Sequence, residues 1–130
     1  MGKIEITKKV LGICATNCYT VVDTETKEAL IIDPADRADV LIRDWKDKGV
    51  TPTTVLLTHG HFDHIGALAG VKKEYPDIKV YAAAEEKEVM ESPALNLSSS
   101  FGAAFTAQAD IYLEDDAEIE VLGRKCKCLL

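Results

Sequence analysis

The sequence predicts an α+β protein in which helices cover one mixed β-sheet. Three strand-like segments follow one another closely, at residues 4–11, 18–22 and 29–32, so we expect them to pair as an antiparallel meander. A segment with helical spacing follows at residues 37–48. Residues 54–57 are nearly all apolar and indicate a strand buried between two helices.

The first predicted helix has an apolar face and recognisable ends. Its apolar residues recur at positions i, i+3, i+4 and i+7, namely Ala38, Leu41, Ile42 and Trp45. We expect Asp36 to cap its first turn and Gly49 to end it. Asp33 and Pro34 end the third strand, because proline cannot continue a ladder and restricts the residue before it. Trp45 is expected to lie in the core and not in a binding site.

The second half of the chain is predicted to contain shorter elements. These are a helix at residues 63–75, a strand at 78–81, an acidic helix at 84–91 and strands at 111–113, 119–122 and 125–130. The core face of the first of these helices is expected to contain Ile65, Leu68, Ala69 and Tyr75. Residues 94–109 lack a clean period and are either a mobile segment that faces substrate or an ordinary surface loop.

Composition is that of a soluble globular protein and argues against two kinds of partner. The 130 residues are 47% hydrophobic and 28% charged, and the formal net charge is −7. Because polyanion binding depends on concentrated Lys and Arg, we expect no nucleic-acid partner. Residues 1–5 lack the apolar core of a signal peptide, and no apolar run approaches membrane-spanning length. We therefore expect no membrane partner, a cytoplasmic location and one domain at residues 1–130.

The four cysteines form two pairs at opposite ends of the chain, Cys14 with Cys18 and Cys126 with Cys128. In a reducing cytoplasm they are expected to be thiols. The alternative is a structural zinc site with four cysteine ligands. The single residue between Cys126 and Cys128 fits that alternative poorly, because structural zinc sites usually have two to four residues between paired cysteines.

All three histidines of the chain lie close together, with an aspartate, after the strand predicted at residues 54–57. Neutral imidazole and carboxylate suit zinc, iron or manganese, and alternating histidines on a turn can direct two rings at one point. We therefore predict that His59 and His61 share one metal ion. Asp63 and His64 could hold a second ion a few ångströms away, as two-metal hydrolases require.

Each of these residues also has an ordinary structural interpretation. A single histidine between a strand and a helix is usually a surface or satisfied polar residue. Asp63 could cap the helix that follows it. Four potential ligands within six positions are harder to explain in this way, so a metal site is the favoured hypothesis.

The run His59-x-His61-x-Asp63-His64 after an apolar strand resembles the metal signature of the metallo-β-lactamase superfamily. The likeness is closest to its glyoxalase II-like (hydroxyacylglutathione hydrolase-like) hydrolases. Three other stretches agree with it, at residues 16–19, 31–34 and 57–58. The resemblance implies an αββα sandwich and a zinc cofactor of one or two ions, with iron or manganese as alternatives. It also implies hydrolysis of a small-molecule thioester by metal-bound hydroxide, with Asp63 as the catalytic residue that orients the hydroxide.

Two further residues have a functional and a structural interpretation. The resemblance places Asp33 beneath the metal loop in a supporting role, whereas the residues alone indicate a turn aspartate equally well. Gly66 lacks a side chain where the loop would pass close to a bound ligand, but a packing glycine explains it equally well.

The resemblance covers about the first half of the family's fold, which is one mixed sheet with its covering helices. It implies later ligands, a bridging aspartate and two more histidines, but no histidine follows His64. We therefore expect residues 1–130 to form a domain truncated before the C-terminal metal ligands, with little or no activity alone. The alternative is a catalytically incompetent metal-binding or assembly half-domain. A sheet without its partner exposes an apolar face, so we expect a homo-oligomer or poor solubility.

Overall fold

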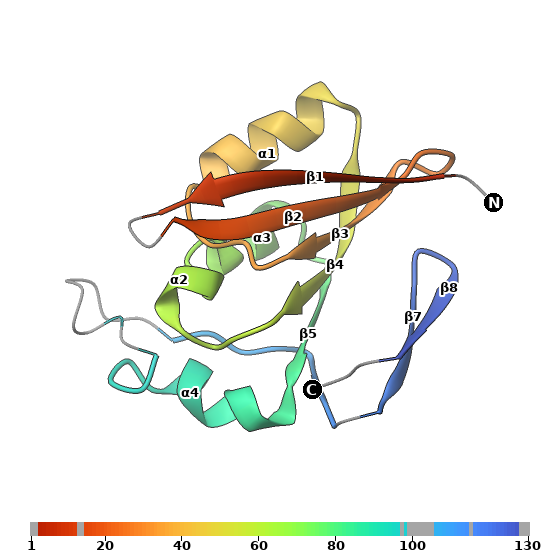
Figure 1. The fold of residues 1–130 in the computed structure, drawn as a ribbon. Helices are drawn as coiled ribbons and strands as arrows, with labels where there is room; N and C mark the ends of the chain where they lie inside the picture. The colour runs from red at the N-terminus through yellow and green to blue at the C-terminus, as the bar shows by residue number, and fades with distance from the viewer. Residues whose placement is uncertain (1–2, 13–14, 97, 99–105, 115, 128–130) are drawn as a thin grey trace.

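The chain is built around one mixed sheet. A computed structural model describes residues 3–12, 15–96, 98, 106–114 and 116–127, with the backbone alone at Phe62, Asp63, Cys126 and Lys127. Within these residues, six strands form a sheet in the order β1-β2-β3-β4-β5-β6 (Figure 1). The strands are β1 (Ile4–Leu11), β2 (Thr16–Asp23), β3 (Glu28–Ile32), β4 (Thr51–Leu57), β5 (Lys79–Ala83) and β6 (Ile111–Leu113).

Short turns and helical crossovers explain why the sheet is mixed. The turn after β2 is closed by Asp23, whose Oδ1 accepts the amide hydrogens of Glu25 and Thr26, so β2 and β3 pair antiparallel. β1 also pairs antiparallel with β2. From β3 to β6 the pairs are parallel, and helices connect β3 to β4 and β4 to β5. The predicted meander, the buried strand and the mixed sheet are confirmed.

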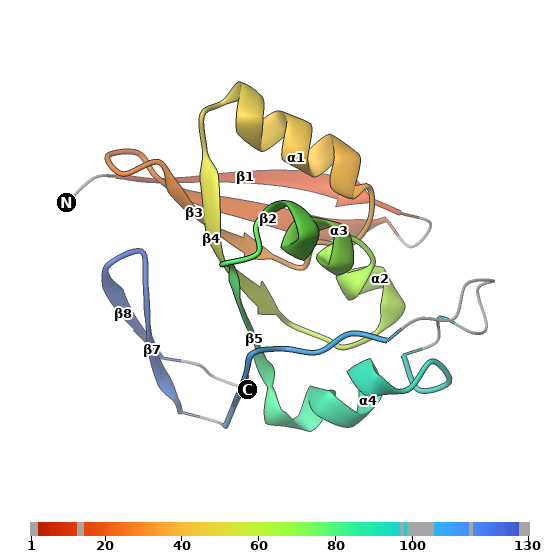
Figure 2. The ribbon, with the colours of Figure 1, turned by 180° about the vertical axis from the view of Figure 1, so that it is seen from behind.

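The crossover helices cover one face of the sheet (Figure 2). They are α1 (Ala38–Asp47), α2 (Phe62–Ile65) and α3 (Leu68–Glu74); η1 (Ala84–Glu86) and α4 (Lys87–Glu91) follow β5. The core lies between this face and the helices. Trp45 is 1% exposed, donates from Nε1 to Thr20 Oγ1 over 3.2 Å and packs edge-on against Tyr75. Its predicted place in the core is confirmed.

The opposite face of the sheet has no helix on it in Figures 1 and 2. Side chains alternate between faces along a strand. The register therefore places Ile6 of β1 on this open face with Val21 of β2 and Leu30 of β3. On β1, Ile6 is 64% exposed and Val10 is 55% exposed. The predicted apolar face is therefore present.

The start of α1 differs from the prediction. Asp36 does not cap the first turn; its Oδ1 accepts the adjacent amide hydrogen of Arg37, over 2.8 Å. Arg37 itself occupies the N-cap position with a left-handed backbone (φ 55°) and makes no capping side-chain hydrogen bond. The side chain of Asp36 is engaged with its neighbour and does not reach the free amides of the helix, so the capping assignment was wrong.

The helix predicted at residues 63–75 is divided into α2 and α3. The break follows from one hydrogen bond, because the Ala67 amide donates to the carbonyl oxygen of Pro34 (2.9 Å) and so leaves the helical ladder. The core face also differs from the prediction. Ala67 and Val71 are buried, whereas Ala69 is exposed.

After β6 the chain forms a hairpin of β7 (Glu118–Val121) and β8 (Arg124–Lys127), a second sheet within the described residues. Arg124 joins this hairpin to the end of β2, with Nη1 2.9 Å from Asp23 Oδ2. Two predictions fall largely outside the described residues. They are the mobile segment within residues 94–109 and the four-cysteine site, whose Cys14 and Cys128 are not described. In the described part of the chain, no helix has the length and apolar character needed to cross a membrane.

Candidate metal centre

The three histidines lie where β4 meets α2, at the carboxyl end of a parallel strand. In open sheets with parallel strands, ligands bind outside these ends. β4 ends at Leu57 and α2 begins at Phe62, with His61 in an extended conformation at the N-cap. His59 and His61 therefore stand on the connecting loop, and His64 stands on the first turn of helix.

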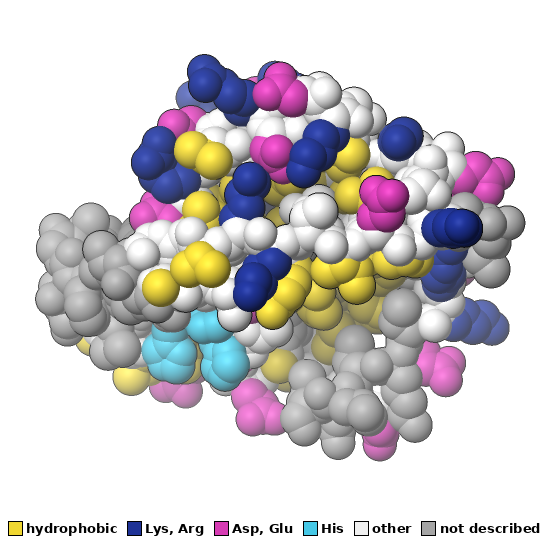
Figure 3. Space-filling view, turned by 45° about the horizontal axis from the view of Figure 1, so that its top comes forward, with side chains coloured by type: hydrophobic (Ala, Val, Ile, Leu, Met, Phe, Trp, Pro, Cys, Tyr) yellow, Lys and Arg dark blue, Asp and Glu magenta, His cyan; other side chains and the backbone are white. Residues whose placement is uncertain are grey.

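The three imidazole rings gather in one place on the surface (Figure 3). The ring centroids of His59 and His64 are 4.8 Å apart, and those of His59 and His61 are 6.2 Å apart. His59 is exposed, whereas His61 and His64 are half-buried. The loop thus brings three imidazole side chains to one solvent-accessible position.

Asp33 lies beneath this loop, at the end of β3. It is 4% exposed and has a left-handed backbone (φ 54°) that turns the chain after the strand. Its Oδ1 accepts the Thr58 amide hydrogen over 2.8 Å, and its Oδ2 lies 3.0 Å from His64 Nδ1. Asp33 therefore turns the chain after β3 and also supports the loop, as the resemblance implied.

The Thr58 hydroxyl links two of the histidines to Asp33. It donates to Asp33 Oδ2, and its oxygen lies 3.2 Å from His59 Nδ1 and 3.3 Å from His64 Nδ1. Because the hydroxyl has one hydrogen, the consistent assignment is that His59 donates from Nδ1 to Thr58 and that His64 donates from Nδ1 to Asp33. A ring held through Nδ1 would coordinate a metal through Nε2.

Sequence reasoning missed two residues on the other side of the loop. The Gly60 amide donates to Glu86 Oε1 over 2.8 Å, and Gly60 packs against Met90 of α4. The one local signal is the glycine between two histidines, since glycine is common where the backbone approaches another group closely. Nothing in the sequence indicates which residues approach it.

The predicted ligands are described to different extents. The backbone of Asp63 lies in the first turn of α2, and its side chain is not described. Among the side chains that are described, no three or more His, Cys, Asp or Glu groups form an assembled metal site. The structure thus gathers His59, His61 and His64, and the assignment of these residues and Asp63 as metal ligands stays a prediction.

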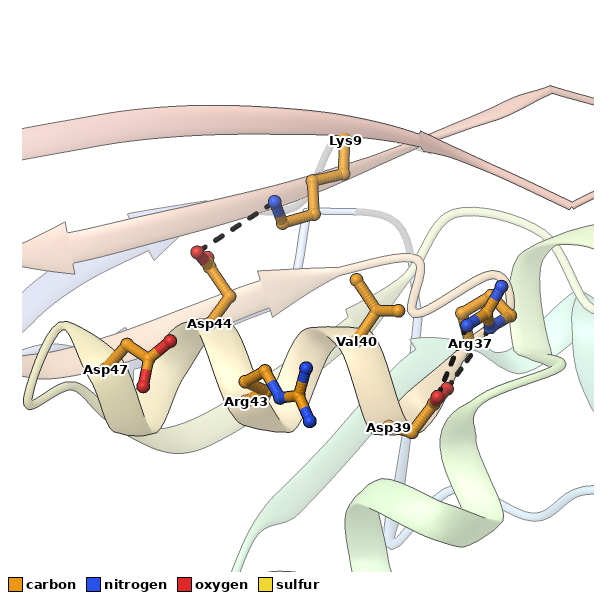
Figure 4. A pocket seen from close by; sticks show the side chains of 7 residues that line it. All are labelled: Lys9, Arg37, Asp39, Val40, Arg43, Asp44 and Asp47. Carbon is orange, nitrogen blue, oxygen red and sulfur yellow. Dashed lines mark hydrogen bonds and ion pairs between the residues drawn. The ribbon is translucent and has the colours of Figure 1, made fainter.

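A groove between β1 and α1 offers a contrast to the histidine group (Figure 4). It is lined by Lys9, Arg37, Asp39, Val40, Arg43, Asp44 and Asp47. Acidic and basic side chains pair across it, with Lys9 Nζ 3.9 Å from Asp44 and Arg37 Nε 3.2 Å from Asp39. A groove lined by three basic and three acidic side chains presents no field of one sign, so we assign no ligand to it.

The fold agrees with comparisons to known proteins. The sequence profile described as "Metallo-beta-lactamase superfamily" matches residues 11–126. The chain belongs to the metallo-β-lactamase superfamily. The six-stranded mixed sheet with helices on one face is metallo-β-lactamase-like, as predicted.

Two curated members of the superfamily illustrate the range of similarity. The chain is 37% identical over 113 residues to the Probable metallo-hydrolase YqgX of Bacillus subtilis, a match that covers 85% of this chain and 52% of that protein. It is 41% identical over 59 residues to a hydroxyacylglutathione hydrolase of Haemophilus ducreyi, which covers 45% of this chain and 25% of that protein. The chain spans about half the length of the B. subtilis protein.

Solved structures of metallo-β-lactamase-like proteins show the same fold. BLEG-1 B3 metallo-β-lactamase has a TM-score of 0.85 and 36% identity, over 95% of this chain and 59% of that one. The di-iron-bound form of TTHA1623 has a TM-score of 0.71 and 28% identity, over 87% and 56%. The class B3 di-zinc enzyme LRA-12 from an Alaskan soil metagenome has a TM-score of 0.68 and 26% identity, over 87% and 45%. Of these relatives, LRA-12 holds two zinc ions and TTHA1623 two iron ions.

Proposed function

We propose that this chain is the histidine-bearing part of a zinc-dependent hydrolase that acts on a small-molecule thioester. The observation that carries the proposal is the group of His59, His61 and His64 at the end of β4. The rings of His59 and His64 have Nδ1 close to Thr58, and His64 also contacts Asp33. Contacts with a buried carboxylate and a hydroxyl are typical of metal-binding histidines and not of ordinary surface histidines.

The donor set fits a divalent transition metal. Imidazole suits zinc and iron, and metal-binding histidines are usually held through their second ring nitrogen by a carboxylate, carbonyl or water, as Asp33 holds His64. His59, His61 and His64 would hold the metal, and Asp63 is proposed as a ligand from its place in the motif. When bound, zinc would lower the pKa of water to about 7 and polarise the scissile carbonyl.

The protein's own residues would orient this chemistry. Asp33 fixes the tautomer and rotation of His64 and increases the basicity of its other nitrogen. Thr58 couples the orientation of His59 to that of His64 through one hydroxyl. Asp63 is proposed to orient the attacking water toward the carbonyl carbon.

A thioester substrate is supported by similarity to hydroxyacylglutathione hydrolases, whose substrates are glutathione thioesters. This match covers 45% of the chain. A β-lactam is the competing substrate, since the B3 metallo-β-lactamase BLEG-1 matches 95% of the chain. Both substrates contain an activated carbonyl, so the chemistry near the histidines would be shared and the remainder of the site would select between them.

A second candidate function is binding or assembly without catalysis. Two observations favour it: the chain contains three histidines in all, and the described side chains form no assembled metal site. The open apolar face would then serve association with a second copy of the chain. This candidate keeps the same ligands, so activity must be measured together with metal content.

The deciding experiment compares the 130-residue chain with a version extended to the length of its relatives. Hydrolysis of a glutathione thioester and of a cephalosporin is measured with added zinc, with His59→Ala as the control. We expect thioester turnover by the extended version, its loss in His59→Ala and negligible turnover by the short chain. Negligible turnover by the short chain is expected because even a misplacement of the reacting groups by about 1 Å costs roughly a hundredfold in rate.

Each other outcome has a definite meaning. Cephalosporin turnover without thioester turnover would replace the proposed substrate. Zinc binding without turnover by either version would favour the assembly function. Equal turnover by both versions, abolished by His59→Ala, would show that these histidines suffice alone.

A further inference from the structure

We infer that Glu86 and Met90 clamp Gly60 and thereby hold His59 and His61 at the spacing that metal binding requires. This inference rests on the proposed function, because it assigns positioning residues to the proposed metal centre. The clamp comes from η1 and α4, which follow β5 and lie outside the histidine run.

The first half of the clamp is a charge-assisted hydrogen bond. The Gly60 amide lies between the two histidines on the loop, and it donates to Glu86 Oε1 over 2.8 Å. An amide–carboxylate bond is roughly twice as strong as a neutral one. Glu86 is half-buried and Gly60 is buried, so water competes weakly for this amide. The bond ties the centre of the loop to a residue 26 positions later.

The second half of the clamp is steric. A Cβ atom at residue 60 would lie 2.7 Å from Met90 Cγ and 3.0 Å from the Glu86 carbonyl oxygen. Positive φ angles among the described glycines occur at Gly12, Gly49 and Gly123. Gly60 is therefore required by space and not by backbone conformation.

Met90 has little freedom to move away from the loop. It is 0% exposed. Its carbonyl oxygen accepts two hydrogen bonds, one from the Ala107 amide over 2.9 Å and one from Asn96 Nδ2 over 3.4 Å. These bonds fasten α4 to the segments that follow it. The wall against which Gly60 packs is thus itself anchored.

Glu86 and Met90 both contact Gly60, at the centre of the loop, whereas Asp33 and Thr58 contact the histidine rings. Asp33 and Thr58 hold the Nδ1 atoms of His59 and His64. By contrast, His61 has no side-chain hydrogen bond among those found for the described residues, and it lies next to Gly60. The clamp is therefore the contact that fixes where the loop passes between His59 and His61, whose ring centroids are 6.2 Å apart.

The test measures zinc affinity of the full chain by competition with a chromophoric chelator, and the absorption spectrum of bound Co²⁺. We expect Glu86→Ala to raise the zinc Kd about 10–100-fold and to change the Co²⁺ spectrum. Glu86→Gln keeps a carbonyl oxygen that can accept the Gly60 amide, so it should recover most of the affinity. The exposed neighbour variant Glu85→Ala is the matched control and should bind zinc as the wild type does.

Two glycine variants separate positioning from folding. Gly60→Ala should weaken zinc binding at least as much as Glu86→Ala. Gly70→Ala is its steric control, because a Cβ there would lie 2.7 Å from Ala38 Cβ, away from the histidines. We expect Gly70→Ala to lower the urea midpoint and to leave the zinc Kd of the folded fraction unchanged.

Hydrogen exchange of the Gly60 amide in the metal-free chain tests the clamp without any metal. We expect exchange to accelerate in Glu86→Ala and to stay slow in Glu86→Gln. If the wild-type chain binds no zinc, the proposed function fails, and slow exchange that depends on Glu86 still supports the clamp. The inference is overturned if Glu86→Ala leaves both exchange and zinc affinity unchanged. It is also overturned if Glu86→Gln keeps the slow exchange of the Gly60 amide but binds zinc as poorly as Glu86→Ala, since the charge of Glu86 would then act on the metal directly and not through the hydrogen bond to Gly60.

Discussion

Asp33 Oδ2 lies 3.0 Å from His64 Nδ1, and this contact joins the end of β3 to the helix that carries the histidine. The carboxylate is buried, and its other oxygen accepts the Thr58 amide hydrogen. A carboxylate in this position holds an imidazole as an Nδ1–H donor and sets its rotation. The orientation of His64 therefore depends on a residue from a different strand.

The first prediction concerns this contact. We expect Asp33→Asn to raise the zinc Kd about 10–100-fold, because the charged acceptor of His64 is lost. Asparagine tolerates the left-handed backbone found at residue 33, so the fold should persist. Isothermal titration of metal-free protein measures the affinity, and far-UV circular dichroism checks the fold. Asp36→Asn, at an exposed carboxylate, is the control, and equal affinities of all three proteins would contradict the prediction.

The second prediction concerns the thiol of Cys18. Burial, with a smaller contribution from the charge of Asp33, raises the pKa of Cys18 to about 12. Since the thiolate is the reactive form, Cys18 should resist iodoacetamide at pH 7 to 8 in the folded protein and react fully in urea. Peptide mass spectrometry quantifies labelling at this position. Rapid modification of Cys18 in the native protein would show that the strand β2 opens readily.

The third prediction concerns the pH dependence of stability at the β2–hairpin junction. The hydrogen bond from Arg124 is the largest cause that lowers the pKa of Asp23 below its ordinary value. A lowered folded-state pKa stabilises the fold above the unfolded-state value of about 3.9, and the contribution is lost as the pH falls through the lowered value. The urea midpoint of the wild type should therefore fall toward that of Asp23→Asn below about pH 4.

The control for the third prediction is Asp39→Asn. Arg37 also lowers the pKa of Asp39, but this pair is exposed on α1. Exposed ion pairs contribute little because solvent screens them. A difference between wild type and Asp23→Asn that stays constant from pH 3 to pH 7 would rule out the linkage.

The fourth prediction concerns the open face of the sheet. We expect the chain to self-associate through this face. Ile6→Lys should shift the distribution toward monomer, because a charge is costly in an apolar interface. Sedimentation velocity at about 100 μM measures the distribution. Thr7→Lys is the matched control, since residue 7 is the neighbour of Ile6 on the other face. Identical distributions for the wild type and Ile6→Lys would locate self-association elsewhere or show that it does not occur.

The sequence by itself determined the features that depend on local pattern. The closeness of the first three strands, the apolar face that contains Trp45 and the clustering of His59, His61 and His64 follow from spacing along the chain. These features were predicted because period and turn length limit which side chains share a face. Of the predicted site, the gathering of the three rings is present in the structure, and the metal role of Asp63 stays a prediction.

Only the tertiary structure decided the features that depend on partners distant in sequence. The break between α2 and α3 arises because the Pro34 carbonyl oxygen accepts the Ala67 amide hydrogen, and no local propensity predicts that hydrogen bond. The contact of Asp33 with His64, and that of Glu86 with Gly60, likewise join residues from separate elements. Such pairs form only after the sheet brings the ends of β3, β4 and β5 together, so their chemistry is set by packing and not by periodicity.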